Sequence, residues 1–203
     1  MDPHCGWCYA NGSNIEYVYN ALLDDLELEI IPGGMWLNEH APTGGEQLKT
    51  FIGQHAPGLV EKTGAELSDD YYALVENPDY TFSSFEPSAA IVAVNTIAPN
   101  KTLAFAKGVQ DAIYKHGQRL DELEAYMPAL TLLGIDLALF KETWLSAANK
   151  AATFASFEEA SGLASGYPTL LLVHEDKYYR VASGYFNGQA IVEGIKTFMF
   201  EPA

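Results

Sequence analysis

Two apolar patterns with different periods follow one another in the N-terminal forty residues. Apolar residues recur at three- and four-residue steps over residues 14–26, which places them on one face of a helix. This helix is expected to begin near residue 5 and to reach Asp25, with a kink or a restart at residues 11–13. Apolar and acidic residues then alternate over residues 26–31, which predicts a β-strand that ends at Pro32.

The middle of the chain, residues 45–162, is predicted to be helical. Residues with capping preferences mark several boundaries, among them Ser68 and Asp121 before helix starts and Gly134 after a helix end. Apolar residues at helical spacing within this region are most simply core residues. The expected helices cover residues 46–61, 68–75, 87–98, 102–116, 121–133, 136–146 and 149–161.

The C-terminal forty residues return to a strand pattern. Residues 167–174 form an apolar run, Glu175-Asp176 is a turn, and residues 177–182 alternate again, so the pattern predicts a β-hairpin. An amphipathic helix carrying Ile191 and Ile195 is expected after it. Strand, helical block, hairpin and helix in this order indicate an α/β chain with helices inserted in its middle.

Length and charge narrow the classes of protein that the chain can belong to. A length of 203 residues with 48% hydrophobic content favours one core with an insertion over two independent domains. The balance of 11 basic and 27 acidic residues gives a net charge of −16, which repels nucleic acids and anionic membrane surfaces. No apolar run of about 18 residues and no basic, then apolar, leader is present, so a cytoplasmic protein is expected.

The only cysteines, Cys5 and Cys8, form a Cys5-Gly6-Trp7-Cys8 motif ahead of the first helical pattern. A cysteine that opens a helix faces unpaired N–H groups, which favour its thiolate. The second cysteine lies one turn along the same face, within bonding reach of the first. This arrangement is typical of a dithiol-disulfide redox site.

The cysteine pair has three other possible interpretations. A structural disulfide across two residues closes too small a loop to restrict the unfolded chain much. A zinc site needs further soft ligands, and the five histidines are scattered without a paired spacing, so no metal is expected. Two inert core thiols are the third alternative.

Three motifs together resemble the DsbA family of thioredoxin-fold oxidoreductases, and its branch of predicted bacterial protein-disulfide isomerases in particular. They are residues 2–9 (DPHCGWCY), residues 85–90 (FEPSAA) and residues 166–169 (GYPT). The resemblance implies an α/β thioredoxin-like fold in residues 1–44 and 163–203, with an inserted all-helical domain in residues 45–162. The family places a strand before the aspartate-proline pair. This first strand is expected to be missing from the chain. The preferred explanation is a start codon assigned too far downstream.

The resemblance also implies an activity and its residues. Cys5 is expected to attack disulfides in client proteins and Cys8 to resolve the mixed disulfide, while Pro168 follows a cis peptide bond beside the pair. His4, Trp7 and Tyr167 are the expected substrate-binding residues. The partners are thiol- or disulfide-containing proteins, with no cofactor other than glutathione as a co-substrate.

Two other functions remain open at this point. One is a glutathione-dependent isomerase or transferase, similar to 2-hydroxychromene-2-carboxylate isomerase or the kappa-class glutathione transferases. These relatives usually keep a single serine or cysteine, so the presence of Cys8 argues against this function. The other is a redox-gated binding module without turnover.

Overall fold

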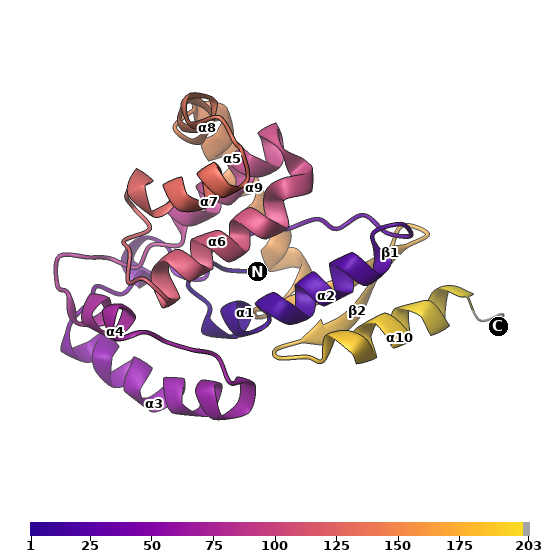
Figure 1. The fold of residues 1–203 in the computed structure, drawn as a ribbon, viewed down its shortest axis with the longest axis horizontal. Coiled ribbons are helices and arrows are strands. Elements are labelled where there is room, and N and C mark those ends of the chain that lie inside the picture. Colours follow the sequence, from indigo (N-terminus) through magenta and orange to yellow (C-terminus); the bar gives the residue numbers. More distant parts are fainter. Residues whose placement is uncertain (201–203) are drawn as a thin grey trace.

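The computed structural model describes residues 1–200 as a mainly helical chain with one two-stranded sheet (Figure 1). The N-terminal helices are α1 (Gly6–Ala10) and α2 (Gly12–Leu22). The middle helices are α3 (Glu46–Thr63), α4 (Asp69–Glu76), α5 (Phe85–Ile97), α6 (Thr102–Tyr114), α7 (Met127–Leu132), α8 (Leu137–Trp144) and α9 (Ala147–Leu163). Strands β1 (Thr169–His174) and β2 (Lys177–Ser183) and helix α10 (Gly188–Phe200) follow.

The helix after the cysteine pair restarts at Asn11, one of the two outcomes that the sequence left open. Asn11 is buried, and its backbone N–H reaches carbonyls of both Trp7 and Cys8, at 3.3 and 3.2 Å. Helix α2 then ends at Leu22 rather than at Asp25. The prediction was wrong by about one turn because two acidic residues, Asp24 and Asp25, stand at the negative end of the helix dipole.

The predicted C-terminal hairpin is confirmed. Strands β1 and β2 pair antiparallel from Thr169 opposite Ser183 to His174 opposite Lys177, with one irregularity in register between Leu170 and Leu171. Glu175 and Asp176 both have positive φ angles, of 50° and 59°. A two-residue turn of this kind matches the twist of the flanking strands.

The predicted strand over residues 26–32 is not formed, which corrects the sequence interpretation. Its alternation is real, since the apolar residues here are half-buried while Glu27 and Glu29 are exposed. Only the end of the segment is paired: the Met1 amino group donates to the Ile31 carbonyl at 2.8 Å, and Gly33 N–H donates to the Met1 carbonyl at 2.8 Å. A strand requires a partner along its length, and no described segment lies within hydrogen-bonding distance of the rest.

The middle helices follow the predicted order with one correction. Ser68 caps α4 as expected, because its hydroxyl accepts from Tyr71 N–H at 3.1 Å. The helix expected over residues 121–133 is shorter, a single 3-10 turn followed by α7. Pro128 lies in the first turn of α7, and a proline cannot donate to a preceding turn, so the helix starts there.

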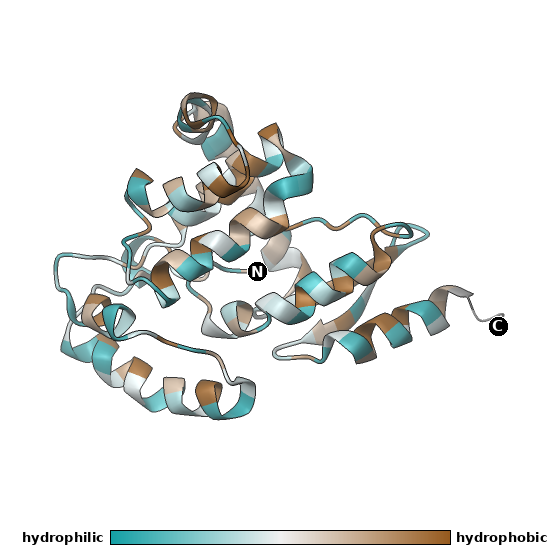
Figure 2. Ribbon diagram, in the orientation of Figure 1, coloured by the Kyte–Doolittle hydropathy of each residue, from teal (hydrophilic) through white to brown (hydrophobic). Residues whose placement is uncertain are grey.

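Two clusters of buried apolar residues hold the described chain together. The larger cluster lies among the middle helices and contains Phe105, Tyr126 and Phe140, each fully buried. The smaller cluster joins α2, β1 and α10. Apolar and polar residues alternate along the two helices, α2 and α10 (Figure 2). Met1, Tyr9 and Trp36 from the N-terminal part also pack on the larger cluster.

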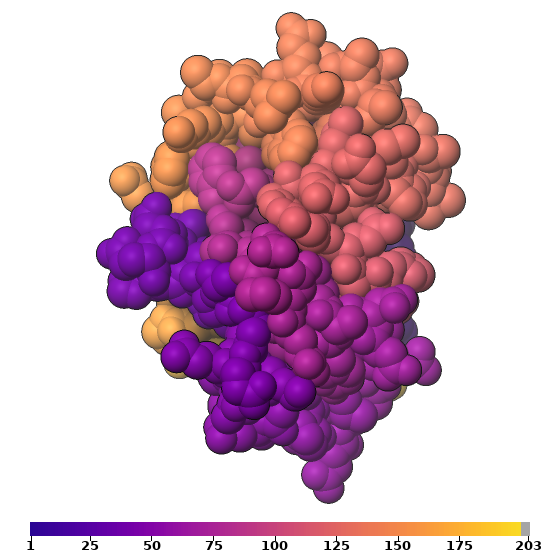
Figure 3. Space-filling view, turned by 90° about the vertical axis from the view of Figure 1, so that its left-hand side faces the viewer, coloured from indigo at the N-terminus to yellow at the C-terminus, as the bar shows by residue number. Residues whose placement is uncertain are grey.

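The surface of the middle helices runs without a break from α3 to the segment around α8 (Figure 3). The division into residues 1–44 with 163–203 and an inserted domain of residues 45–162 stays a prediction.

No helix within residues 1–200 is both long enough and apolar enough to cross a membrane.

Candidate active site

Cys5 occupies the N-cap position of α1, as the sequence predicted. Its backbone is extended, with φ −82° and ψ 110°, and its carbonyl accepts the N–H groups of Cys8 and Tyr9 at 2.9 and 3.1 Å. Both cysteines are free thiols, 6% and 5% exposed. The first turn of α1 therefore carries the two sulfurs on one short, hydrogen-bonded element.

The pKa values of the two thiols are shifted in opposite directions. The pKa of Cys5 is lowered, chiefly by a hydrogen bond from the Cys8 thiol and further by the backbone N–H groups of Cys8 and Trp7, against the opposing effect of burial. The pKa of Cys8 is raised well above its ordinary value, first by burial and then by its interaction with Cys5. Cys5 is thus the thiol that ionises first, and Cys8 serves as its donor.

Pro168 lies beside the pair, and the expected cis bond between Tyr167 and Pro168 is confirmed. The Cys5 thiol donates a hydrogen bond to the Tyr167 carbonyl over 3.4 Å, across 162 positions of sequence. Pro168 is buried, and its carbonyl accepts Gly184 N–H at 2.9 Å. The hairpin therefore closes directly onto the N-terminal cysteine motif.

Asp2 is a component of the site that the sequence interpretation missed. Its side chain is fully buried, and its carboxylate accepts hydrogen bonds from His4 N–H at 2.9 Å, Met35 N–H at 2.7 Å and the Ser84 hydroxyl at 3.1 Å. Local sequence could not reveal this role, because the donors from Met35 and Ser84 lie 33 and 82 residues away.

Tyr114 is a second component that local patterns did not reveal. Its hydroxyl donates to the His4 carbonyl at 2.6 Å, and its ring stacks on Tyr9 with centroids 4.6 Å apart. Burial raises the pKa of Tyr114 well above its ordinary value, so the hydroxyl remains a proton donor at neutral pH. The residue anchors the turn before Cys5 from α6.

The three expected substrate-binding residues occupy different environments. Trp7 is half-buried, with the Lys62 ammonium group 5.7 Å from its ring. Tyr167 is half-buried, and its hydroxyl donates to the Gly33 carbonyl at 2.8 Å.

His4 differs from the other two because it lies in the interior, 4% exposed, with its ring 5.5 Å from Phe82 and 5.9 Å from Trp36. Its Nε2 atom lies 3.0 Å from the Ser83 carbonyl. Burial lowers the pKa of His4, against the opposing effect of Asp2, so the ring is neutral at pH 7. The ring therefore packs inside the fold in this structure, and its expected contact with a client protein stays a prediction.

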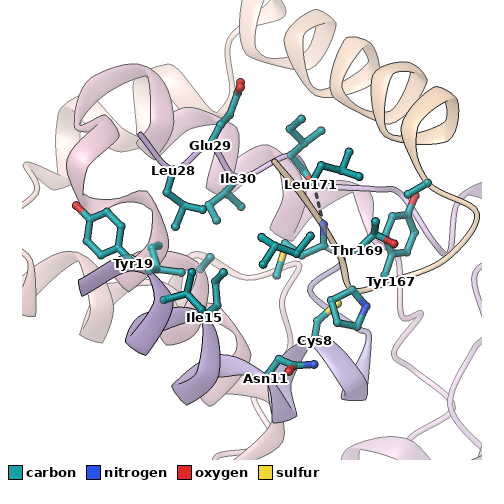
Figure 4. Close-up of a pocket in the computed structure, with 18 of the residues that line it drawn as sticks. Cys8, Asn11, Ile15, Tyr19, Leu28, Glu29, Ile30, Tyr167, Thr169 and Leu171 are labelled. Carbon is teal, nitrogen blue, oxygen red and sulfur yellow. Dashed lines mark hydrogen bonds between the residues drawn. The ribbon is translucent and has the colours of Figure 1, made fainter. Parts of the chain in front are cut away.

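A groove of about 780 Å³ runs from Cys8 between two extended segments (Figure 4). Leu28 and Ile30 lie on one wall, while Thr169 and Leu171 of β1 lie on the other. Ile15 and Tyr19 of α2 also line it. The groove separates this segment from the free edge of β1, so the two do not pair as strands.

No group of three or more His, Cys, Asp or Glu side chains in the described part of the chain is arranged to hold a metal ion. The site that the structure assembles consists of two thiols, backbone carbonyls, buried phenols and the Asp2 carboxylate, whose oxygens already accept three hydrogen bonds. Such a set suits proton transfer and thiol chemistry.

A cysteine pair at a helix start, a cis-proline before the hairpin and a helical block between them define a thioredoxin-like fold of the DsbA type. Comparison with solved structures confirms this fold. A candidate protein disulfide isomerase from Nitrosomonas europaea superposes with a TM-score of 0.84 at 22% identity, covering 100% of this chain and 96% of that one. No protein-family model and no curated protein matches the sequence.

A second similar structure is the cytosolic disulfide reductase DsbM from Pseudomonas aeruginosa. It has a TM-score of 0.82 at 23% identity and covers 98% of this chain and 96% of that one. The same reductase with GSH has a TM-score of 0.81 over the same coverage. These likenesses establish the fold.

Proposed function

We propose that the protein is a thiol-disulfide oxidoreductase that acts on disulfides of client proteins through Cys5 and Cys8. The observation that carries the proposal is that the pKa of Cys5 is lowered while the pKa of Cys8 is raised. Cys5 also lies beside the Tyr167 carbonyl, which precedes a cis-proline. A reactive thiolate next to a protonated resolving thiol is what disulfide exchange requires. The disulfide isomerase and reductase descriptions of the similar structures support the same class.

The reaction begins when the Cys5 thiolate attacks one sulfur of a client disulfide. A Cys5–client disulfide forms, and the other client sulfur leaves as a thiolate that takes up a proton. Cys8 then loses its proton and attacks the Cys5 sulfur, which releases the second client thiolate. The client has gained two electrons and two protons, and Cys5–Cys8 has become a disulfide.

The cycle closes when two equivalents of a small thiol reduce the Cys5–Cys8 disulfide and become oxidised to one disulfide. Glutathione is the proposed reductant, supported by the description of DsbM with GSH. We also infer a cytoplasmic location, where this thiol is abundant and for which the cytosolic DsbM is the supporting relative.

Client proteins are proposed to approach over Trp7 and Tyr167. Both side chains are half-buried; Trp7 lies within the cysteine motif, and Tyr167 comes from a separate segment whose carbonyl accepts the Cys5 thiol. The Tyr167 carbonyl, which accepts the Cys5 thiol in the free protein, is released when the thiol ionises. It is then free to accept an N–H group of an extended client segment.

The test is reduction of insulin disulfides by glutathione, followed by the turbidity of the released chains. The wild-type chain should accelerate the reaction over glutathione alone, and Cys5→Ser should return it to background. Cys8→Ser should stop after the first step and accumulate a mixed disulfide with insulin, visible as an added mass. Since these are the only cysteines, no third thiol can substitute for either.

A different result would reverse the proposal. If wild-type protein leaves insulin intact while Cys8→Ala retains glutathione-dependent turnover of a small electrophile, the chain is a glutathione-dependent isomerase or transferase. If neither substrate turns over and only the affinity for a protein partner changes with oxidation, the chain is a redox-gated binding module.

A further inference from the structure

Asp2 is the acidic residue that lies nearest to both sulfurs along the chain, and it is completely buried. Its backbone contacts both cysteines: its carbonyl accepts Cys5 N–H at 3.2 Å, and its N–H lies 3.5 Å from the Cys8 sulfur. The residue therefore forms part of the wall around the two thiols and is not a distant surface charge.

The carboxylate is held in one place by donors from three segments. His4 N–H and the Ser84 hydroxyl reach one oxygen, and Met35 N–H reaches the other at 2.7 Å. Ser84 is itself fully buried and accepts Trp36 N–H at 3.1 Å. A buried charge needs such partners because it has lost its hydration shell.

A fixed negative charge beside a thiol disfavours the thiolate. Asp2 raises the pKa of Cys5, opposing the hydrogen bonds that lower it. Its other titratable neighbours are Tyr114 on α6 and Tyr167 before β1, whose pKa values it also raises, and His4. Glu86 of α5 acts on His4 as well. Tyr114 and Tyr167 stay neutral at pH 7 because their pKa values are raised. The cation that adjoins Asp2 in the chain is the Met1 ammonium group, which donates to the Ile31 carbonyl and lowers the pKa of Cys8.

We propose that Asp2 is a positioning residue that both orders the turn before Cys5 and makes the cysteine pair a stronger reductant. This inference rests on the proposed function, since it concerns the same pair. Ionisation of Cys5 stabilises the reduced form, whereas the oxidised form has no thiol to ionise. A negative charge that destabilises the thiolate therefore shifts the equilibrium toward the disulfide, so the dithiol gives up its electrons more readily.

The test compares Asp2→Asn with wild type in two measurements that need no client protein. The first is the pH dependence of Cys5 alkylation by iodoacetamide, and the second is the equilibrium of the pair with reduced and oxidised glutathione. Removing the charge should lower the Cys5 pKa and reduce the equilibrium constant for oxidation at least threefold, which corresponds to a potential less negative by ~14 mV.

Two control variants separate charge from structure. Ser84→Ala removes a donor to Asp2 and an acceptor for Trp36 but keeps the charge, so it should lower the unfolding midpoint without lowering the Cys5 pKa. Asp25→Asn makes the same change in net charge on an exposed side chain, ~25 Å along the helices from Cys8. It should leave both measurements unchanged because that distance exceeds the screening length.

The outcomes are distinct from those that decide the proposed function. A wild type that reduces insulin, together with an Asp2→Asn chain whose Cys5 pKa and glutathione equilibrium are unchanged or shifted the opposite way, overturns the role of Asp2 alone. Asp2→Ser, which removes the same charge with less bulk, replaces Asp2→Asn if that variant does not unfold cooperatively. If neither variant folds, Asp2 serves the fold only and the effect on the potential is refuted.

Discussion

Replacing Asn11 by alanine should destabilise the protein by disconnecting the cysteine helix from the C-terminal hairpin. The Asn11 side chain is 2% exposed and makes three hydrogen bonds. Its amide group donates to the carbonyls of Trp7 at 2.9 Å and Gly184 at 3.2 Å, and its oxygen accepts Phe186 N–H at 3.2 Å. Two of these bonds join residues more than 170 positions apart, so the side chain links the two ends of the chain.

The magnitude follows from the groups left without partners. Each hydrogen bond contributes about 1 kcal/mol net, and a buried group that loses its partner costs about 1–3 kcal/mol. The costs of neighbouring groups do not add fully, so we expect a loss of about 2–4 kcal/mol in the free energy of unfolding. For a chain of this length, 1 kcal/mol corresponds to roughly 2–4 °C, which places the fall in melting temperature at about 5–15 °C.

The assay is thermal and urea unfolding followed by circular dichroism on the reduced protein. Asn20→Ala is the matched control, because Asn20 is an exposed position of the same helix α2, where a substitution changes stability by no more than about 0.5 kcal/mol. A variant Asn11→Ala within 0.5 kcal/mol of wild type would refute the conclusion that this side chain ties the helix to the hairpin.

Three further predictions address the thiols, the packing and the phenols. Cys8→Ala should raise the Cys5 pKa, because the Cys8 thiol is the main cause of its lowering; an unchanged pH profile of alkylation would contradict this. Gly33→Ala places a methyl group 2.0 Å from a tyrosine ring atom and should cost more than about 2 kcal/mol, whereas Gly53→Ala, in open space within α3, should be neutral or stabilising by up to about 1 kcal/mol. Burial raises the pKa of Tyr114 well above its ordinary value. Neutral Tyr114 therefore stabilises the folded state fully at pH values below the pKa of tyrosine in the unfolded chain, which is about 10. This stabilisation is lost as the pH rises beyond that value. Tyrosinate absorbance and circular dichroism should therefore change together above about pH 10, and ionisation of all tyrosines without unfolding would be inconsistent with this.

The elements that sequence predicted well are those defined by residues close together in the chain. The hairpin turn at Glu175 and Asp176, the cap at Ser68 and the helix start at Cys5 each depend on hydrogen bonds spanning a few residues. The order of the middle helices was also predicted well, because each helix follows from its own local apolar pattern. The exact ends of helices were less accurate, as at Leu22 of α2, because neighbouring charges and capping decide the last turn.

The residues that sequence did not reveal act across long separations. Tyr114 reaches the His4 carbonyl from 110 residues away, and nothing in its own neighbourhood distinguishes it from any other aromatic core residue. His4 was expected among the substrate-binding residues, and its sequence neighbours did not indicate that its ring packs against Trp36 and Phe82. Sequence distance from Cys5 therefore says little about which side of the backbone a residue faces.

The sequence by itself determined the chemistry that is available: two thiols three residues apart, their place at a helix start, and the alternating or helical period of each segment. The place at the helix start already favoured the Cys5 thiolate, but only the tertiary structure supplied the burial that raises the pKa of Cys8. It also decided that residues 26–32 remain unpaired beside the groove. Periodicity is a property of one segment, whereas desolvation and strand pairing exist only between segments that the fold has brought together.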